Sequence, residues 1–128
     1  MAAPFIVIRT FRIKEGKIEA FKQFLPEFFK TIESNEPRVL ALNAYVNQEG
    51  TEAAFVHVYP DAVAMEFHEK VAHQHTEQAR TQFLEATTSL QVYGKPSHVV
   101  LEKTRHLAGT GIPLTVKPEH LGGFTRLG

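Results

Sequence analysis

The sequence contains no cysteine and no tryptophan among its 128 residues. Without cysteine, the chain cannot form disulfides, use a thiolate as a nucleophile, or hold zinc or an iron–sulfur cluster through sulfur ligands. Any chemistry must therefore come from histidine, tyrosine, asparagine or carboxylate side chains, or from a bound cofactor.

The chain also has no formal net charge, because fourteen Lys and Arg residues balance fourteen Asp and Glu residues. The chain thus lacks the positive field that attracts nucleic acids and anionic membranes. No apolar run approaches the roughly 18–20 residues that cross a bilayer, and residues 1–12 lack the pattern of a signal peptide. We expect a cytoplasmic protein that binds neither nucleic acid nor membrane.

Length and periodicity predict a single α+β domain with one core, since the chain is 43% hydrophobic. Runs of β-formers indicate strands at 4–13, 39–47, 53–59 and 97–104, and apolar residues at helical spacing indicate helices at 17–34, 62–71 and 76–90. Asp61 is placed to cap the helix at 62–71. The resulting β-α-β-β-α-β order predicts a ferredoxin-like fold, in which helices cover one face of a four-stranded antiparallel sheet.

The C-terminal segment differs from the rest in being rich in glycine and proline. We therefore expect a domain at 1–105 and a loop-rich tail at 106–128, ordered only where it packs on a partner. Apolar tail residues such as Leu121 and Phe124 are costly to leave in water, which suggests that the tail reaches across to a second subunit.

Side-chain alternation divides the two middle strands between a helix-facing side and an uncovered side. We expect aliphatic residues on the helix side: Leu42, Ala44, Val56 and Val58. The uncovered side then presents a polar and aromatic set: Asn43, Tyr45, Phe55, His57 and Tyr59. Such a surface is typical of a small-molecule site, and it is also suited to burial against a second subunit. The two interpretations are compatible, because stacked sheets can enclose a cavity.

Seven histidines raise the question of a metal site, especially His68, His73 and His75. Their spacing does not favour one, because residues two apart cannot share a helix face and no HExxH or two-His-one-carboxylate pattern occurs. We expect no metal. No serine lies in a nucleophile-elbow context, and neither a Walker motif nor GxGxxG is present.

Three segments resemble the antibiotic biosynthesis monooxygenase family of dimeric α+β barrels. They are the opening strand followed by Glu15-Gly16-Lys17, the strand-to-helix step Phe55-Val56-His57-Val58-Tyr59-Pro60-Asp61-Ala62, and Met65-Glu66-Phe67-His68 leading to Val71-Ala72-His73. The resemblance covers about residues 4–104. It implies a homodimer whose sheets stack into a barrel, with a pocket between sheet and helices in each subunit.

The resemblance also implies a chemistry. Cofactor-independent members are thought to let a deprotonated phenolic substrate react with dioxygen, so that the protein supplies a base and an enclosed apolar site. Tyr59 matches an aromatic position of the family at the end of the third strand, and His68 and His73 match helix-borne histidines. The haem-degrading branch carries Asn near Ile8, so haem degradation is not expected.

We therefore predict a monooxygenase that needs no cofactor and acts on a small hydrophobic phenolic, quinol or polyketide-like substrate. His57 or His68 is the predicted base, because imidazole has an ordinary pKa of about 6.5. The predicted substrate-binding residues are Asn43, Tyr45, Phe55, Tyr59 and His73. Two alternatives remain open: a non-catalytic dimeric barrel that binds a small apolar ligand or only dimerises, and an isomerase or cyclase that uses the same pocket without oxygen.

Overall fold

The structure is a computed structural model that describes the backbone of residues 3–126 and the side chains of all of these except 107 and 108. Strands and helices follow one another along this part of the chain as β1 (Phe5–Ile13), α1 (Ile18–Asn35), β2 (Ala41–Val46), β3 (Glu52–Tyr59), α2 (Ala62–Val71), α3 (His73–Gln82), β4 (Leu84–Tyr93), α4 (His98–Ala108) and β5 (Leu114–Lys117). No helix in the described part is both long and apolar enough to cross a membrane.

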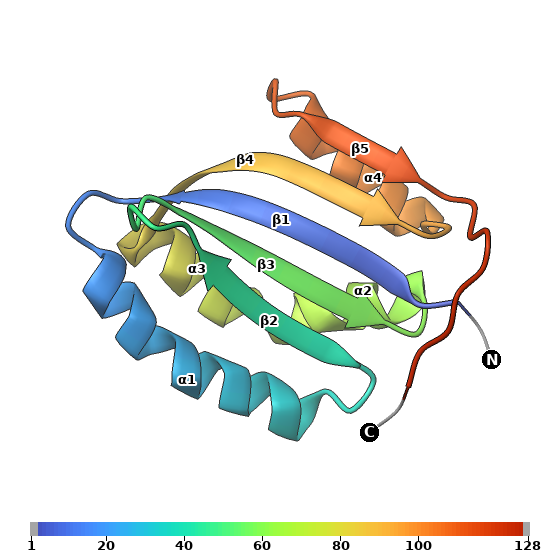
Figure 1. Cartoon of the computed structure of the whole chain (residues 1–128), viewed down its shortest axis with the longest axis horizontal. Coiled ribbons are helices and arrows are strands. Elements are labelled where there is room, and N and C mark those ends of the chain that lie inside the picture. The colour runs from blue at the N-terminus through green and yellow to red at the C-terminus, as the bar shows by residue number, and fades with distance from the viewer. Residues whose placement is uncertain (1–2, 127–128) are drawn as a thin grey trace.

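The strands form one five-stranded sheet in the order β2-β3-β1-β4-β5. Every neighbouring pair is antiparallel except β4 and β5, which run parallel. The helices cover one face of the sheet and leave the other face open (Figure 1). The fold is therefore the predicted ferredoxin-like α+β arrangement, with a fifth strand that makes the sheet mixed.

An aromatic core joins α1 to the β2–β3 half of the sheet. Phe21, Phe28 and Ile32 are the buried residues of α1, and their spacing defines a single helix face. On β3, the ring of Phe55 lies 6.1 Å from that of Phe21 and 6.5 Å from that of Phe28, measured between centroids. These contacts determine which face of β3 lies under the helices.

A second core lies under the β1–β4 half of the sheet, where α2 and α4 pack. Its buried members are mainly apolar: Phe5, Val7, Tyr59, Ala62, Ala64, Met65, Leu90, Val92 and Val100. Leu90, Val92 and Val100 are fully buried at 0% exposure. The site described below lies beside this core.

The prediction of which β3 side chains face the helices is wrong: the phase of their alternation is reversed. Asn43 pairs with Val56, whereas Leu42 pairs with His57. Neighbours in register share a face, so His57 and the alternate residues Phe55 and Tyr59 lie under the helices, and the valines lie on the open face. The sequence pattern did not distinguish the two phases, because β3 is apolar on both sides; the large aromatic rings are needed to fill the space beneath α1 and α2.

The predicted helix at 76–90 is confirmed only as far as Gln82, and the predicted strand at 97–104 is wrong. α3 ends at Gln82, and β4 begins at Leu84, whereas residues 98–108 form α4. The spacing of Ala79, Phe83 and Leu90 fits a helix, but β4 also contains threonines and valine that favour a strand, and pairing with β1 on one side and β5 on the other decides the outcome.

The segment 106–128, which we expected to be loop-rich, contributes β5 to the sheet. Leu114 is opposite Leu90 and Val116 is opposite Val92. Both tail residues pack against the second core. Leu121 and Phe124, farther along, are 91% and 82% exposed.

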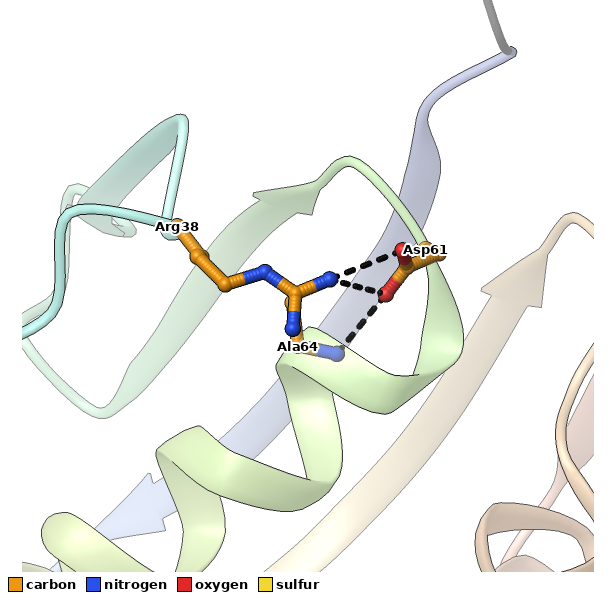
Figure 2. A network of polar contacts seen from close by, with 3 residues as sticks. All are labelled: Arg38, Asp61 and Ala64. Atoms are coloured by element: carbon orange, nitrogen blue, oxygen red, sulfur yellow. Dashed lines mark hydrogen bonds and ion pairs between the residues drawn. The ribbon is translucent and has the colours of Figure 1, made fainter.

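α2 begins with the predicted cap. The Asp61 carboxylate accepts a hydrogen bond from the Ala64 backbone N–H at 2.9 Å. Both carboxylate oxygens also accept from one nitrogen of Arg38, at 3.0 and 2.8 Å (Figure 2). Because Arg38 follows α1, the interaction links the entry of β2 to the start of α2.

Replacing the cap tests how far it stabilises the fold. We expect Asp61→Ala to lower the free energy of unfolding by about 1–2 kcal/mol, because a first-turn amide of α2 loses its acceptor. Arg38→Ala, which removes only a half-exposed ion pair, is expected to cost less than about 1 kcal/mol. Urea denaturation of both variants measures the difference, and equal losses would mean that the ion pair, not the cap, stabilises this corner.

Candidate functional site

A group of polar and aromatic side chains lies between the sheet and α2, near the C-terminal end of α1. β3 supplies His57 and Tyr59, α2 supplies His68, and Glu36 is the C-cap residue of α1. We call these four residues the histidine cluster. Tyr59 is 1% exposed, Glu36 2% and His68 5%, whereas His57 is partly buried.

Local structure explains why the two helix residues point inward. The Glu36 backbone N–H donates to the Ile32 carbonyl, which continues the last turn of α1. Ile32 is buried, so Glu36, four residues later, extends the same buried face. On α2, His68 follows Ala64 and Met65 on the buried stripe at the same helical spacing. Neither orientation requires an unusual backbone.

The central contact is a hydrogen bond between Nδ1 of His68 and Oε1 of Glu36, at 2.9 Å. When Glu36 is ionised, Nδ1–H donates to it, and the neutral ring keeps its lone pair on Nε2. Burial raises the pKa of the Glu36 carboxyl, while the charge and hydrogen bond of His68 act in the opposite direction. The pair therefore fixes the orientation of His68 and presents a basic nitrogen.

The three rings of the cluster lie close together. Ring centroids of His57 and His68 are 5.2 Å apart, and that of Tyr59 is 5.8 Å from each of them. His57 and Tyr59 are stacked, with an angle of 14° between their planes. The sequence therefore brings two imidazoles and a phenol to one point beneath the sheet.

Burial affects the protonation of the two β3 residues in different ways. Burial lowers the pKa of His57 to about 3, and the nearby charges of His68 and Arg9 add smaller contributions. Burial, and then the charges of Glu69 and Glu36, raise the pKa of Tyr59 well above its usual value. At physiological pH both side chains are neutral, so His57 is a weak base and Tyr59 is a hydrogen-bond donor.

Several polar atoms of the cluster have no protein partner. Oε2 of Glu36 and Nδ1 of His57 are buried without a hydrogen bond. Among the described residues, nothing hydrogen-bonds to the Tyr59 hydroxyl or to Nε2 of His68, and neither of these two atoms is fully buried. A buried polar group left unpaired costs about 1–3 kcal/mol, and native proteins pair nearly all of them with protein, water or ligand. The unpaired atoms make the cluster the best candidate for a binding site in the described part of the chain.

The cluster is equipped for proton transfer. It contains a base oriented by a carboxylate, a neutral imidazole and a neutral phenol, with their rings close together. Within the described residues, no three His, Asp or Glu side chains are placed to hold a metal ion. Two surface hollows, one between α1 and β2 and one beside the β1–α1 turn, contain none of the cluster residues.

The structure brings some of the predicted site residues together. His57, His68 and Tyr59 meet in the cluster. Phe55 lies next to them, with its ring 6.3 Å from that of His57, and also belongs to the aromatic core under α1. These four share the helix side of the sheet, not the open side on which we expected the β3 residues.

The other predicted residues lie elsewhere. Asn43 and Tyr45 are exposed on the open face of β2, and Tyr45 is 64% exposed. The sheet separates them from the histidine cluster. His73 begins α3 with an exposed side chain. None of these three residues takes part in the hydrogen bond or the ring contacts of the cluster.

Glu36 was missed by the sequence analysis. It lies in Asn35-Glu36-Pro37, which we interpreted only as the end of a helix. Its partner is 32 positions away, and no local pattern connects the two. The available signal was the position of Glu36 four residues after Ile32, in phase with the apolar stripe of α1.

Comparison with known proteins places the chain in a family. The family model described as antibiotic biosynthesis monooxygenase matches residues 4–80. The chain belongs to that family, which confirms the resemblance seen in the sequence. A search of curated proteins found no significant match.

Solved structures share the fold. MupZ from Pseudomonas fluorescens is 24% identical, with a TM-score of 0.71, over 96% of this chain and 94% of that one. PA3566 from Pseudomonas aeruginosa is 17% identical, with a TM-score of 0.60, over 72% and 93%. A protein described as an antibiotic biosynthesis monooxygenase is 20% identical, with a TM-score of 0.59, over 69% and 94%. The likeness to MupZ extends well beyond residue 80.

The pKa of His57 leads to a prediction about stability. Because this pKa is lower in the folded protein than in the unfolded chain, the unfolded chain binds an extra proton below about pH 6.5 and stability falls as the pH drops toward 3. We expect a loss of about 2 kcal/mol between pH 6.5 and pH 5 from this group. Urea denaturation at both pH values, for the wild type and His57→Gln, measures it. Equal losses in the two proteins would contradict the prediction.

Proposed function

We propose that the protein is an enzyme that removes a proton from a small hydrophobic phenolic, quinol or polyketide-like substrate, which then reacts with dioxygen without a cofactor. The observation that carries the proposal is the buried hydrogen bond between His68 and Glu36. Membership of the antibiotic biosynthesis monooxygenase family supports the reaction class.

His68 is the proposed catalytic base. Its Nε2 is free of protein partners in the described structure, and Glu36 stabilises the imidazolium that forms when it accepts a proton. His57 is a poorer base, because burial holds its pKa to about 3. It serves instead as a neutral hydrogen-bonding group.

Tyr59 is the proposed donor to the negative oxygen that develops on the substrate. Its phenol stays neutral, lacks a protein hydrogen-bond partner among the described residues and lies 5.8 Å from the His68 ring, centroid to centroid. A donor in an enclosed, apolar site stabilises developing charge more strongly than it would in water. Phe55 and the adjacent aromatic core favour an apolar substrate.

A second reaction class uses the same groups without oxygen. The cluster contains a base and neutral donors, which suffice for an isomerase or cyclase that moves a proton within its substrate. The Glu36–His68 pair supports this class as well as the first. The two classes differ in whether the product gains oxygen.

The test measures turnover of a panel of anthrones, quinols and phenolic polyketide analogues. Oxygen uptake and the mass of the product are the two readouts. We expect oxygen uptake with the wild type, and a loss of about a hundredfold or more in kcat for His68→Ala. Glu36→Gln should lose less and shift the pH profile of kcat, because Gln can still accept from Nδ1 but carries no charge. His106→Ala, an exposed histidine on α4, is the control and should retain full activity.

Other outcomes separate the alternatives. Consumption of substrate under argon, with unchanged mass, would favour the isomerase or cyclase. Binding to the cluster without any turnover would favour the non-catalytic ligand-binding protein. Full activity of His68→Ala would contradict the assigned base.

We also propose that the open face of the sheet pairs with a second copy to form a dimeric barrel. Apolar side chains gather on this face: Ile6, Ile8, Val56 and Val58, with Tyr45 beside them. An apolar face of this extent is costly to leave in water. Members of the family are commonly dimeric, which supports the proposal.

A charge in the middle of that face should separate the subunits. Light scattering of the wild type is expected to give about twice the chain mass of 14.4 kDa. Val56→Lys places a charge opposite Ile8 on the neighbouring strand and should give the monomer mass. Val63→Lys, at an exposed position of α2, is the matched control and should remain dimeric. A monomeric wild type would contradict the proposal.

A further inference from the structure

Arg9 lies on β1 beside the histidine cluster. Its neighbours in register are Phe55 on β3 and Leu90 on β4. Both are buried on the helix side, at 8% and 0% exposure. The half-buried Arg9 side chain therefore extends from the helix side of the sheet, toward the same space as His57 and Tyr59.

Arg9 has no carboxylate partner in the described part of the chain. Within the described residues its guanidinium makes no hydrogen bond or ion pair. The guanidinium carbon of Arg9 lies over the ring of Phe11, 5.9 Å from the ring centroid. Three other arginines form ion pairs with a carboxylate: Arg12, Arg38 and Arg80. Arg9 differs from them in being less exposed and unpaired.

The acidic group that acts on Arg9 is already engaged. Glu69 on α2 raises the pKa of Arg9, against the larger lowering caused by burial. However, its carboxylate is hydrogen-bonded to Nζ of Lys103 on α4 at 2.7 Å. Guanidinium stays protonated in proteins, so the site holds a positive charge without a matching anion in contact.

An unpaired guanidinium that is partly removed from water destabilises the fold unless an anion pairs with it. Burying an uncompensated ion costs more than burying a neutral polar group, and proteins normally pair such ions. Guanidinium also offers planar donors that match a carboxylate or another anionic oxygen. The neighbouring groups on β3, His57 and Tyr59, are neutral and can donate hydrogen bonds to the same anion.

We propose that Arg9 binds an anionic oxygen of the ligand, so that the ligands of this site are small hydrophobic molecules carrying a carboxylate or a phenolate. This inference rests on the histidine cluster being the binding site of the proposed function. Arg9 anchors the anionic end of the ligand, while the aromatic surroundings of Phe55 hold its apolar part. Neutral hydrophobic molecules of the same shape bind weakly.

The test compares matched pairs of probes that differ in charge. 2-Naphthoate is compared with 2-naphthamide for a carboxylate, and ionised 4-nitrophenol with 4-nitroanisole for a phenolate. Binding is measured by calorimetry, and by the NMR signals of the His57 and His68 rings to locate it. We expect the anion of at least one pair to bind about tenfold or more tightly than its neutral partner.

Variants on the same strand assign the effect to Arg9. Arg9→Met should abolish the preference for the anion, and Arg9→Lys should keep a reduced preference. Arg12→Met is the control, because Arg12 is exposed on β1 and should not alter binding. The proposal is overturned if neither anion is preferred, or if Arg9→Met keeps the preference.

Stability without ligand separates a binding role from a structural one. If Arg9 is an unpaired cation, Arg9→Met should raise the urea midpoint of the free protein. A fall in the midpoint would indicate a structural ion pair and would contradict the inference. These experiments measure binding and stability alone, so a failure of oxygen uptake would count against the proposed reaction and not against the anion site.

Discussion

The hydrogen bond between His68 and Glu36 connects the end of α1 to the last turn of α2 beneath the sheet. Both side chains are almost fully buried, at 5% and 2% exposure. A buried ionisable group without a partner is strongly destabilising, so each residue depends on the other. The position of α2 over β3, and hence the distance of His68 from His57 and Tyr59, follows from this pair.

The site combines two environments that oppose each other. The phenylalanines under α1 and the aliphatic core under α2 and α4 make the space apolar, which favours neutral side chains. Glu36, Arg9 and His68 introduce polar or charged groups into that space. The apolar surroundings lower the pKa of His57 and raise that of Tyr59. His68 is oriented by its hydrogen bond to Glu36. The same enclosure thus gives neighbouring residues different roles.

The sequence predicted the class of fold and the family, because both depend on local periodicity and on motifs between β1 and α2. It also singled out His57, Tyr59 and His68. It did not predict the phase of β3, because a strand apolar on both faces carries no signal of which face is covered. β4 was missed for a related reason: its pairing with β1 and β5 outweighs a helical spacing. The contact of Glu36 with His68 is long-range, and its identification required the fold.

Reversing the phase of β3 changes what each face of the sheet can do. With His57 and Tyr59 under the helices, the groups suited to chemistry lie on the covered face, and the open face carries Ile6, Ile8, Val56 and Val58. A subunit interface on the open face then need not contain catalytic groups. The proposed dimerisation and the proposed ligand binding are separable properties, since Val56 and His57 are adjacent in the chain but point to opposite sides of the sheet. A substitution on one face therefore affects the other face only through the backbone of β3.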